Sequence, residues 1–403
     1  MSKHYGLSRF VRYVGAVLTL IFFSGFIQAG EGDNWEINGF VTQGFALADD
    51  NNVYGDSESG SFDFRELGLN SAVRINDRLL ITGQVMSRKA GSVDDGDPML
   101  DYGLLDYRLL EAESGYVGIK LGRIKNPFGF YNKTRDVAFT RPSIMLPQSL
   151  YFDRARNLEL SSDGGMLYGY RLLDSGRISS EIVVGAPRKD LNVEYAYLNN
   201  DWPGSFTDSE GYLWRTEYSL SDYSFIAAFS YGNFKLDFEV PGVPALGAPG
   251  DGVVDIDVAA LSLQYNLDQW SLTGEYFRQD INWGSLGGVY SLIPENSSES
   301  FYLQLEHRFN SEVSMFLRRD ILYIDMDDRD GSKAEQLFGK PAHTQYAFDW
   351  TLGVGWEPSR DWLFRAEWHH VEGTGWLATQ DNPDDALKVE DWNMLLLQAT
   401  YRF

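Results

Sequence analysis

The chain carries sixteen successive segments in which apolar and polar residues alternate. Within residues 62–75, for example, Leu67 and Leu69 alternate with Glu66 and Asn70. A period of two places successive side chains on opposite faces of a strand, and about nine to eleven residues cross a bilayer as a tilted strand. The pattern predicts an all-β fold, a sixteen-stranded antiparallel transmembrane β-barrel, with the even strand number of bacterial single-chain barrels. The expected strands are residues 35–46, 62–75, 79–88, 104–112, 116–125, 165–172, 178–186, 212–218, 223–231, 257–267, 270–277, 301–309, 313–319, 349–357, 362–370 and 393–403.

The connections between these segments alternate between short and long. The short ones are rich in Asp, Asn, Ser, Pro and Gly, which form tight turns with little strain. Short turns at one end and long loops at the other are typical of outer-membrane barrels, in which the long loops face the outside of the cell. The expected turns are residues 76–78, 113–115, 173–176, 219–222, 268–269, 310–312 and 358–361, and the longest loops are residues 187–211, 232–256, 279–300, 321–348 and 371–392.

The first residues have the form of a secretory signal peptide. Lys3, Arg9 and Arg12 precede an apolar run over residues 14–27, and a small residue, Ala29, follows at a plausible cleavage position. The run is too short for a membrane-spanning helix, which needs about 20 apolar residues. We expect export with removal of the leader. The expected division is a signal peptide over residues 1–29 and an outer-membrane barrel over residues 30–403.

Composition excludes several other classes of protein. The chain has 34 basic and 58 acidic residues, a net charge of −24, and the leader holds three of the basic ones. Such an acidic chain is unsuited to nucleic acid, whose binding depends on neutralising phosphates. It has no cysteine, so disulfides do not hold the exported chain.

One stretch, residues 126–157, cannot form a strand. Pro127, Pro142 and Pro147 each lack a backbone donor, and a connection of this length without regular structure is usually functional or disordered. Its many apolar residues favour burial over disorder, so we expect a loop folded inward into the barrel after the fifth strand. There it would form a pore constriction carrying five basic and two acidic residues: Lys133, Arg135, Arg141, Arg154, Arg156, Asp136 and Asp153.

Two short motifs resemble those of known outer-membrane proteins. The last residues, 397–403, read LQATYRF and resemble the C-terminal signature of Gram-negative barrels, which ends in an aromatic residue, here Phe403. Residues 122–129, GRIKNPFG, are similar to the segment that opens the constriction loop in phosphate-selective (O/P-type) porins and their relatives. The whole mature chain resembles trimeric sixteen-stranded porins in architecture.

The resemblance implies passive diffusion of small hydrophilic solutes, anions among them, with no catalytic residues and no cofactor. It further implies a homotrimer in the outer membrane, contact with lipid and lipopolysaccharide, and insertion by machinery that recognises Phe403. Two alternatives remain open: an outer-membrane enzyme of the lipase or protease type, and a receptor or adhesin that uses the long loops. No histidine or carboxylate spacing indicates a metal site.

Inward positions of the expected strands carry both signs of charge, so the pore wall alone is close to balanced. The loop adds a positive excess at the narrowest point, where confinement strengthens its field, and this predicts a modest anion preference. The alternative is that the loop cations pair with wall carboxylates and only hold the loop in place. Arg123 and Lys125 are expected to face outward. The expected wall residues are Arg88, Arg108, Lys120, Arg215, Arg318, Arg365, Glu66, Asp106, Glu181, Glu217, Glu275 and Glu367.

Overall fold

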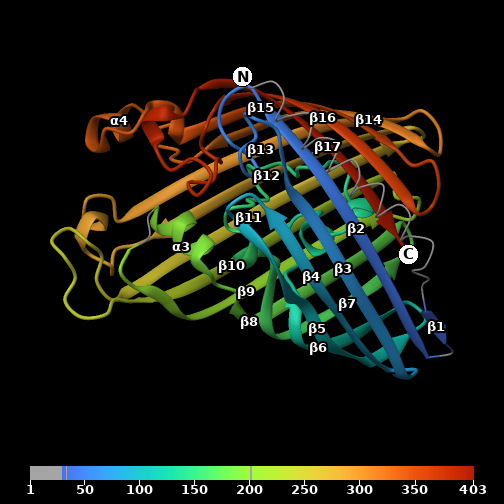
Figure 1. Ribbon diagram of the computed structural model, residues 1–403. Helices are drawn as coiled ribbons and strands as arrows, with labels where there is room; N and C mark the ends of the chain where they lie inside the picture. The colour runs from blue at the N-terminus through green and yellow to red at the C-terminus, as the bar shows by residue number, and fades with distance from the viewer. Residues whose placement is uncertain (1–29, 33, 200–201) are drawn as a thin grey trace.

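The computed structural model describes residues 30–32, 34–199 and 202–403; the predicted signal peptide lies outside the described residues. Sixteen long antiparallel strands, β2 to β17, form one closed barrel (Figure 1). Their bounds are β2 Trp35–Ala48, β3 Ser61–Asn76, β4 Leu79–Ala90, β5 Asp94–Ala112, β6 Gly115–Lys125, β7 Ser161–Leu173, β8 Gly176–Pro187, β9 Ser205–Leu220, β10 Phe225–Glu239, β11 Gly252–Leu267, β12 Trp270–Asn282, β13 Glu295–Arg308, β14 Val313–Tyr323, β15 Tyr346–Trp356, β16 Trp362–Gly373 and β17 Asp391–Arg402. The predicted fold class is confirmed.

The barrel closes where its last strand pairs with its first long strand. β17 runs antiparallel to β2, and Thr400 lies directly opposite Thr42 with their hydroxyls 2.9 Å apart in the interior. Phe403 extends this seam by exchanging two backbone hydrogen bonds of 3.0 Å with Gly39. A short strand, β1 (Gly30–Gly32), pairs with β2 beside the barrel. Closure leaves the sixteen long strands without an exposed sheet edge.

Side chains alternate between an apolar outer wall and a filled interior. In β11, Ala260 and Ser262 are buried, whereas Leu261 and Leu263 are 46% and 44% exposed on the outside. This is the alternation expected of a strand between lipid and lumen. Large aromatic rings also face outward, as amphipathic rings do at membrane interfaces; they include Trp214, Trp270, Trp350, Trp356 and Trp368.

The two ends of the barrel differ. The long loops, with α3 (Leu191–Leu198) and α4 (Ser332–Phe338), gather at one end, which we call the loop end, and the C-terminus lies toward the other, the turn end (Figure 1). Most strands continue beyond their predicted limits toward the loop end; β11, for instance, begins at Gly252, five residues before the prediction. There the polarity of the two faces is reversed in β10 and β11: Leu236, Val254 and Ile256 are buried inside, whereas polar residues such as Lys235 and Asp237 are exposed outside. Across the described residues, no helix is both long and apolar enough to cross a membrane.

The chain between β6 and β7 enters the barrel. It contains two short 3₁₀ turns, η2 (Asn132–Thr134) and η3 (Ala138–Thr140), and one helical turn, α2 (Arg156–Leu160). Its apolar residues form most of the buried core together with inward residues of the wall, among them Phe277 and Tyr302. The interior is therefore occupied by the chain's own loop.

Packing at Gly68 supplies a test of the strand register. A Cβ atom there would lie 2.2 Å from the ring of Phe40, which is buried on the neighbouring strand. We expect Gly68→Ala to destabilise the barrel by about 1–3 kcal/mol through overpacking. Gly274→Ala is the matched control, because a Cβ there meets no atom closer than 3.4 Å. The measurement is the temperature at which the compact barrel converts to the extended chain on denaturing gels, and equal temperatures for both variants would contradict this register.

Candidate functional site

The loop over residues 126–160 crosses the bore from β6 to the opposite wall. The backbone N–H of Met145 donates to Glu367 on β16 at 3.2 Å, and the neighbouring N–H of Ile144 donates to the same carboxylate. On β13, the hydroxyl of Ser300 donates to the carbonyl of Ser149 at 2.7 Å. Buried backbone polar groups need such partners. The loop is thus a fixed part of the interior.

Wall residues predicted to line the pore bind the loop. Glu275 accepts hydrogen bonds from the N–H of Phe130 at 2.9 Å and from the hydroxyl of Tyr151 at 2.7 Å. Arg318 donates to the carbonyl of Met145 at 3.0 Å. Arginine suits this role because its planar group offers five donors in a fixed arrangement.

Two further wall arginines bind loop carbonyls. Arg215 donates from Nε to the carbonyl of Gly129 at 2.9 Å, and Arg365 donates to that of Ala138 at 2.8 Å. Together with Glu275, Glu367 and Arg318, they hold the loop from four strands of the wall, β9, β12, β14 and β16. These charged side chains therefore use hydrogen-bonding groups on polar groups of the loop.

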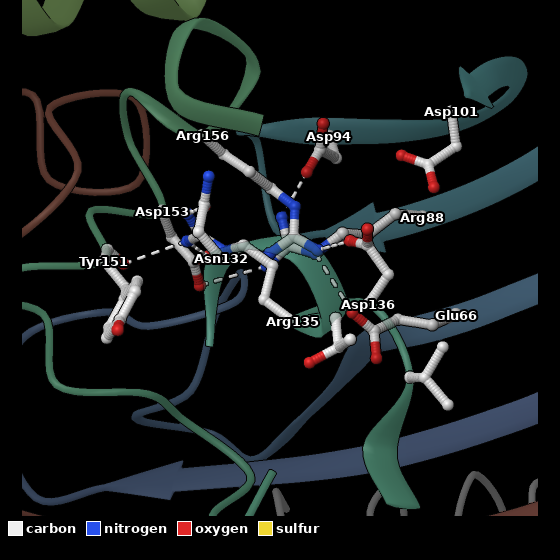
Figure 2. Close-up of polar contacts among 12 residues, drawn as sticks. Glu66, Arg88, Asp94, Asp101, Asn132, Arg135, Asp136, Tyr151, Asp153 and Arg156 are labelled. Carbon is white, nitrogen blue, oxygen red and sulfur yellow. Dashed lines mark hydrogen bonds and ion pairs between the residues drawn. The ribbon is translucent and has the colours of Figure 1, made fainter. Parts of the chain in front are cut away.

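A cluster of charged side chains joins the loop to the wall at β4 and β5 (Figure 2). Arg88 of β4 contacts Asp153 of the loop at 3.0 Å, and Arg135 contacts the same carboxylate at 3.2 Å. Arg156 contacts Asp153 at 3.3 Å and also pairs with Asp136. The structure therefore brings four of the predicted loop residues together with two predicted wall residues, Arg88 and Glu66, which lie 3.4 Å apart.

The pKa values of the two carboxylates that contact Arg135, Asp153 and Glu159, are shifted in opposite directions. Burial alone would raise the pKa of Asp153, yet Arg88, Arg156 and Arg135 together hold it below its usual value. Burial raises the pKa of Glu159 to about 8 even though Arg135 lies 3.0 Å away. Removing one member of a buried ion pair leaves its partner uncompensated, which costs about 3–5 kcal/mol.

Of the three remaining loop cations, Arg141 joins this cluster through Glu66, whereas Lys133 and Arg154 lie apart from it. Arg141 contacts Glu66 of β3 at 3.2 Å, and Lys133, whose side chain is 40% exposed, contacts Glu181 of β8 at 2.7 Å. Arg154 differs from the other four. Among the described residues, its guanidinium has no ion pair or hydrogen bond, and it lies over the ring of Phe152 at 5.5 Å from the centroid.

Other predicted wall residues lie away from the loop. Lys120 lies over the ring of Tyr168, 4.5 Å from its centroid, and the Tyr168 hydroxyl donates to Asp106. Arg108 contacts Glu111 at 3.0 Å near the turn end. Glu217 lies on β9 and pairs at 2.5 Å with Arg215, the arginine that also binds the loop.

Sequence reasoning missed several members of the site. Lys125 was expected to face outward, but it binds Asp101 at 2.5 Å and also Asp136 inside the barrel. β6 ends at Lys125 and the chain then turns inward, so strand alternation no longer sets the direction of this side chain. Arg123 does face outward, paired with the exposed Asp163 at 2.7 Å. Asp94 and Asp101 lie on the loop-end extension of β5, where a longer predicted strand would have included them.

The loop separates two water-accessible cavities. At the turn end, a cavity of about 410 Å³ is lined by Tyr131 and Arg141 of the loop and by Glu306 and Glu357 of the wall. At the loop end, a cavity of about 350 Å³ reaches Arg154. Two smaller cavities, of about 30 and 70 Å³, are also lined by Arg154.

The described residues contain no group of three or more His, Cys, Asp or Glu side chains placed to hold a metal ion. His369 is buried against Asp349 at 2.8 Å, while His370 stacks on Trp368 at the outer surface. The two imidazoles therefore face opposite sides of β16.

Comparisons with known proteins identify the fold. No protein-family model and no curated protein matches the chain. Among solved structures, it resembles the anion-selective porin from Comamonas acidovorans (12% identity, 93% of this chain and 100% of that chain, TM-score 0.56). It also resembles the trimer form of OmpT, an outer membrane protein of Vibrio cholerae (11%, 92% and 99%, 0.54), and the outer membrane channel DcaP of Acinetobacter baumannii (10%, 94% and 100%, 0.54). The chain has the sixteen-stranded barrel fold of Gram-negative outer-membrane porins.

The charged cluster can be tested through Arg88. Arg88→Ala leaves Glu66, Asp94 and Asp153 short of one buried cation, so we expect a loss of about 3–5 kcal/mol and a lower thermal transition. Arg278→Ala is the control, because Arg278 is 46% exposed and pairs with Asp280, whose side chain is 42% exposed. Circular dichroism during heating measures both, and a transition for Arg88→Ala equal to that of the control would contradict the anchoring role.

Proposed function

We propose that this protein is a porin of the outer membrane that lets small hydrophilic solutes diffuse passively through its bore. The observation that carries this proposal is the infolded loop. It crosses the interior of a cylinder with an apolar outer wall, and it leaves cavities of about 350 and 410 Å³ on its two sides. A barrel of this width holds an aqueous passage, and a loop fixed within it limits the size of the solutes that pass.

The orientation follows from the ends of the barrel. In outer-membrane barrels the short turns face the periplasm and the long loops face the outside. The leader over residues 1–29 supports export to this membrane, and Phe403 supports recognition by the insertion machinery. Its aromatic outer wall supports contact with lipid and lipopolysaccharide. A homotrimer is supported by the trimer form of the structural neighbour OmpT.

The proposed selectivity is a modest preference for anions. Four of the five loop cations pair with carboxylates, which removes most of the positive excess that the loop sequence carries. What remains is concentrated at Arg154, and a confined site strengthens the field of a single charge. The name of the Comamonas neighbour, an anion-selective porin, supports the sign of this preference. Phosphate as the particular solute is left to experiment.

Planar-bilayer recording tests the porin proposal directly. We expect the purified protein to produce stable conductance steps in KCl, grouped in threes if it is a trimer. Incubation with lipid and peptide substrates tests the enzyme alternative on the same preparation. Hydrolysis without conductance would overturn the proposal in favour of an enzyme, and binding of cells or ligands without conductance would favour a receptor or adhesin.

Selectivity has its own test at Arg141. Arg141→Ala removes a cation that lines the turn-end cavity and leaves Glu66 with Arg88 as its remaining partner. We therefore expect the reversal potential in a KCl gradient to shift toward that of a cation-selective pore. Arg319→Ala is the matched control, because Arg319 lies over the outward-facing ring of Trp350. Equal reversal potentials for both variants would contradict a contribution of loop charge.

A further inference from the structure

The loop-end cavity has an unusual distribution of charge. Among the described residues, its charged lining consists of three cations, Arg154, Lys340 and Lys388, and one anion, Asp385. Both lysines contact the single carboxylate, Lys388 at 2.5 Å and Lys340 at 3.5 Å. One carboxylate cannot neutralise two ammonium groups and a guanidinium. The cavity therefore has an excess of positive charge in a chain whose net charge is −24.

Arg154 projects a donor group into this cavity that no described side chain uses. Its neighbours in the loop, Asp153 and Arg156, belong to the charged cluster at β4 and β5, whereas Arg154 reaches the loop-end side. Burial lowers the pKa of Arg154, because the charged form loses contact with water there. A planar guanidinium without a partner is suited to a carboxylate or phosphate, which it can bind through two parallel hydrogen bonds.

The rest of the cavity lining is partly polar and partly apolar, the apolar part being Ile324, Leu377 and Pro383. Thr344, Gln345, Thr374 and Thr379 add hydroxyl and amide groups to the lining. The backbone N–H of Thr374 donates to the carbonyl of His343 at 2.8 Å, which joins the loop after β16 to the loop before β15. A cavity of about 350 Å³ falls in the range of small-molecule sites, and a preformed site loses less entropy when it binds.

We propose that the loop-end cavity is a binding site for small oxyanions, carboxylates or phosphate, with Arg154 at its floor and Lys340 and Lys388 at its side. The inference rests on the proposed porin function and adds to it a defined site. An anion entering the cavity of about 350 Å³ from the loop end meets the constriction loop at Arg154, which also lines two smaller cavities of about 30 and 70 Å³. Occupation of the site by a slowly exchanging anion obstructs the passage of chloride.

The test is inhibition of the KCl current by inorganic phosphate and, separately, by succinate, added on the loop-end side. We expect at least one probe to reduce the wild-type current. Arg154→Gln should raise the half-inhibiting concentration about tenfold, as expected when a hydrogen bond to a charged group is lost. The half-inhibiting concentration for Arg154→Lys should lie between those of the wild type and Arg154→Gln, because lysine keeps the charge but lacks the planar group. Arg329→Gln is the control, since Arg329 is 52% exposed and pairs with Glu299 outside this cavity.

A second measurement detects binding of the anion without recording a current. Phosphate or succinate should raise the unfolding temperature of the wild-type protein and of Arg329→Gln, but not that of Arg154→Gln, because a ligand stabilises only the state that binds it. If Arg154→Gln does not fold, Lys388→Gln takes its place. Conductance without inhibition by either probe, or with equal inhibition in all variants, would overturn the anion site and leave the porin proposal standing. Absence of conductance with ligand-dependent stabilisation would overturn the porin proposal alone.

Discussion

Compensation of buried charge determines how the interior of this barrel is built. Arg88, Arg135 and Arg156 can lie inside only because Asp136 and Asp153 lie among them. Charges removed from water need such partners, and a single unpaired member is costly. The pair between Arg88 and Asp153 also joins the loop to the wall. The interactions that compensate the buried charges therefore also help to set the shape of the passage. Arg154, which stands outside this network, is the loop cation most available to a solute.

The strands follow closely from the sequence, and the reason is the membrane. Lipid on one face and a polar interior on the other impose a period of two, which identified all sixteen long strands and the turns that join them. Beyond the apolar band, the outer face becomes polar and the inner face of β10 and β11 becomes apolar, so the pattern that identifies a membrane strand no longer applies. The loop-end extensions of β5 and β11, and the helices α3 and α4, were therefore not predicted.

The site was predictable in location but not in its pairings. Three prolines and many apolar residues predicted that the loop lies inside the barrel. The partners of its cations, in contrast, depend on distances between segments that are far apart in the chain. Arg141 meets Glu66, 75 positions away, and Lys133 meets Glu181, 48 positions away. Alternation assigns each side chain to a face, but it does not say which opposite charge lies within reach. Lys125 shows the same limit, because it lies where the strand ends and the loop begins.

The seam between β2 and β17 has a consequence for how the molecule is assembled. Its two strands are the first and last long strands, so the wall remains open until the final residues, through Phe403, reach Gly39. The loop after β6 binds wall residues on β12 to β16, which lie far along the chain from it, so its final contacts need these strands in place. Its enclosure must therefore come late, either before the seam joins or together with it. A barrel that sealed first would have to admit a bulky, hydrogen-bonded segment through its open end.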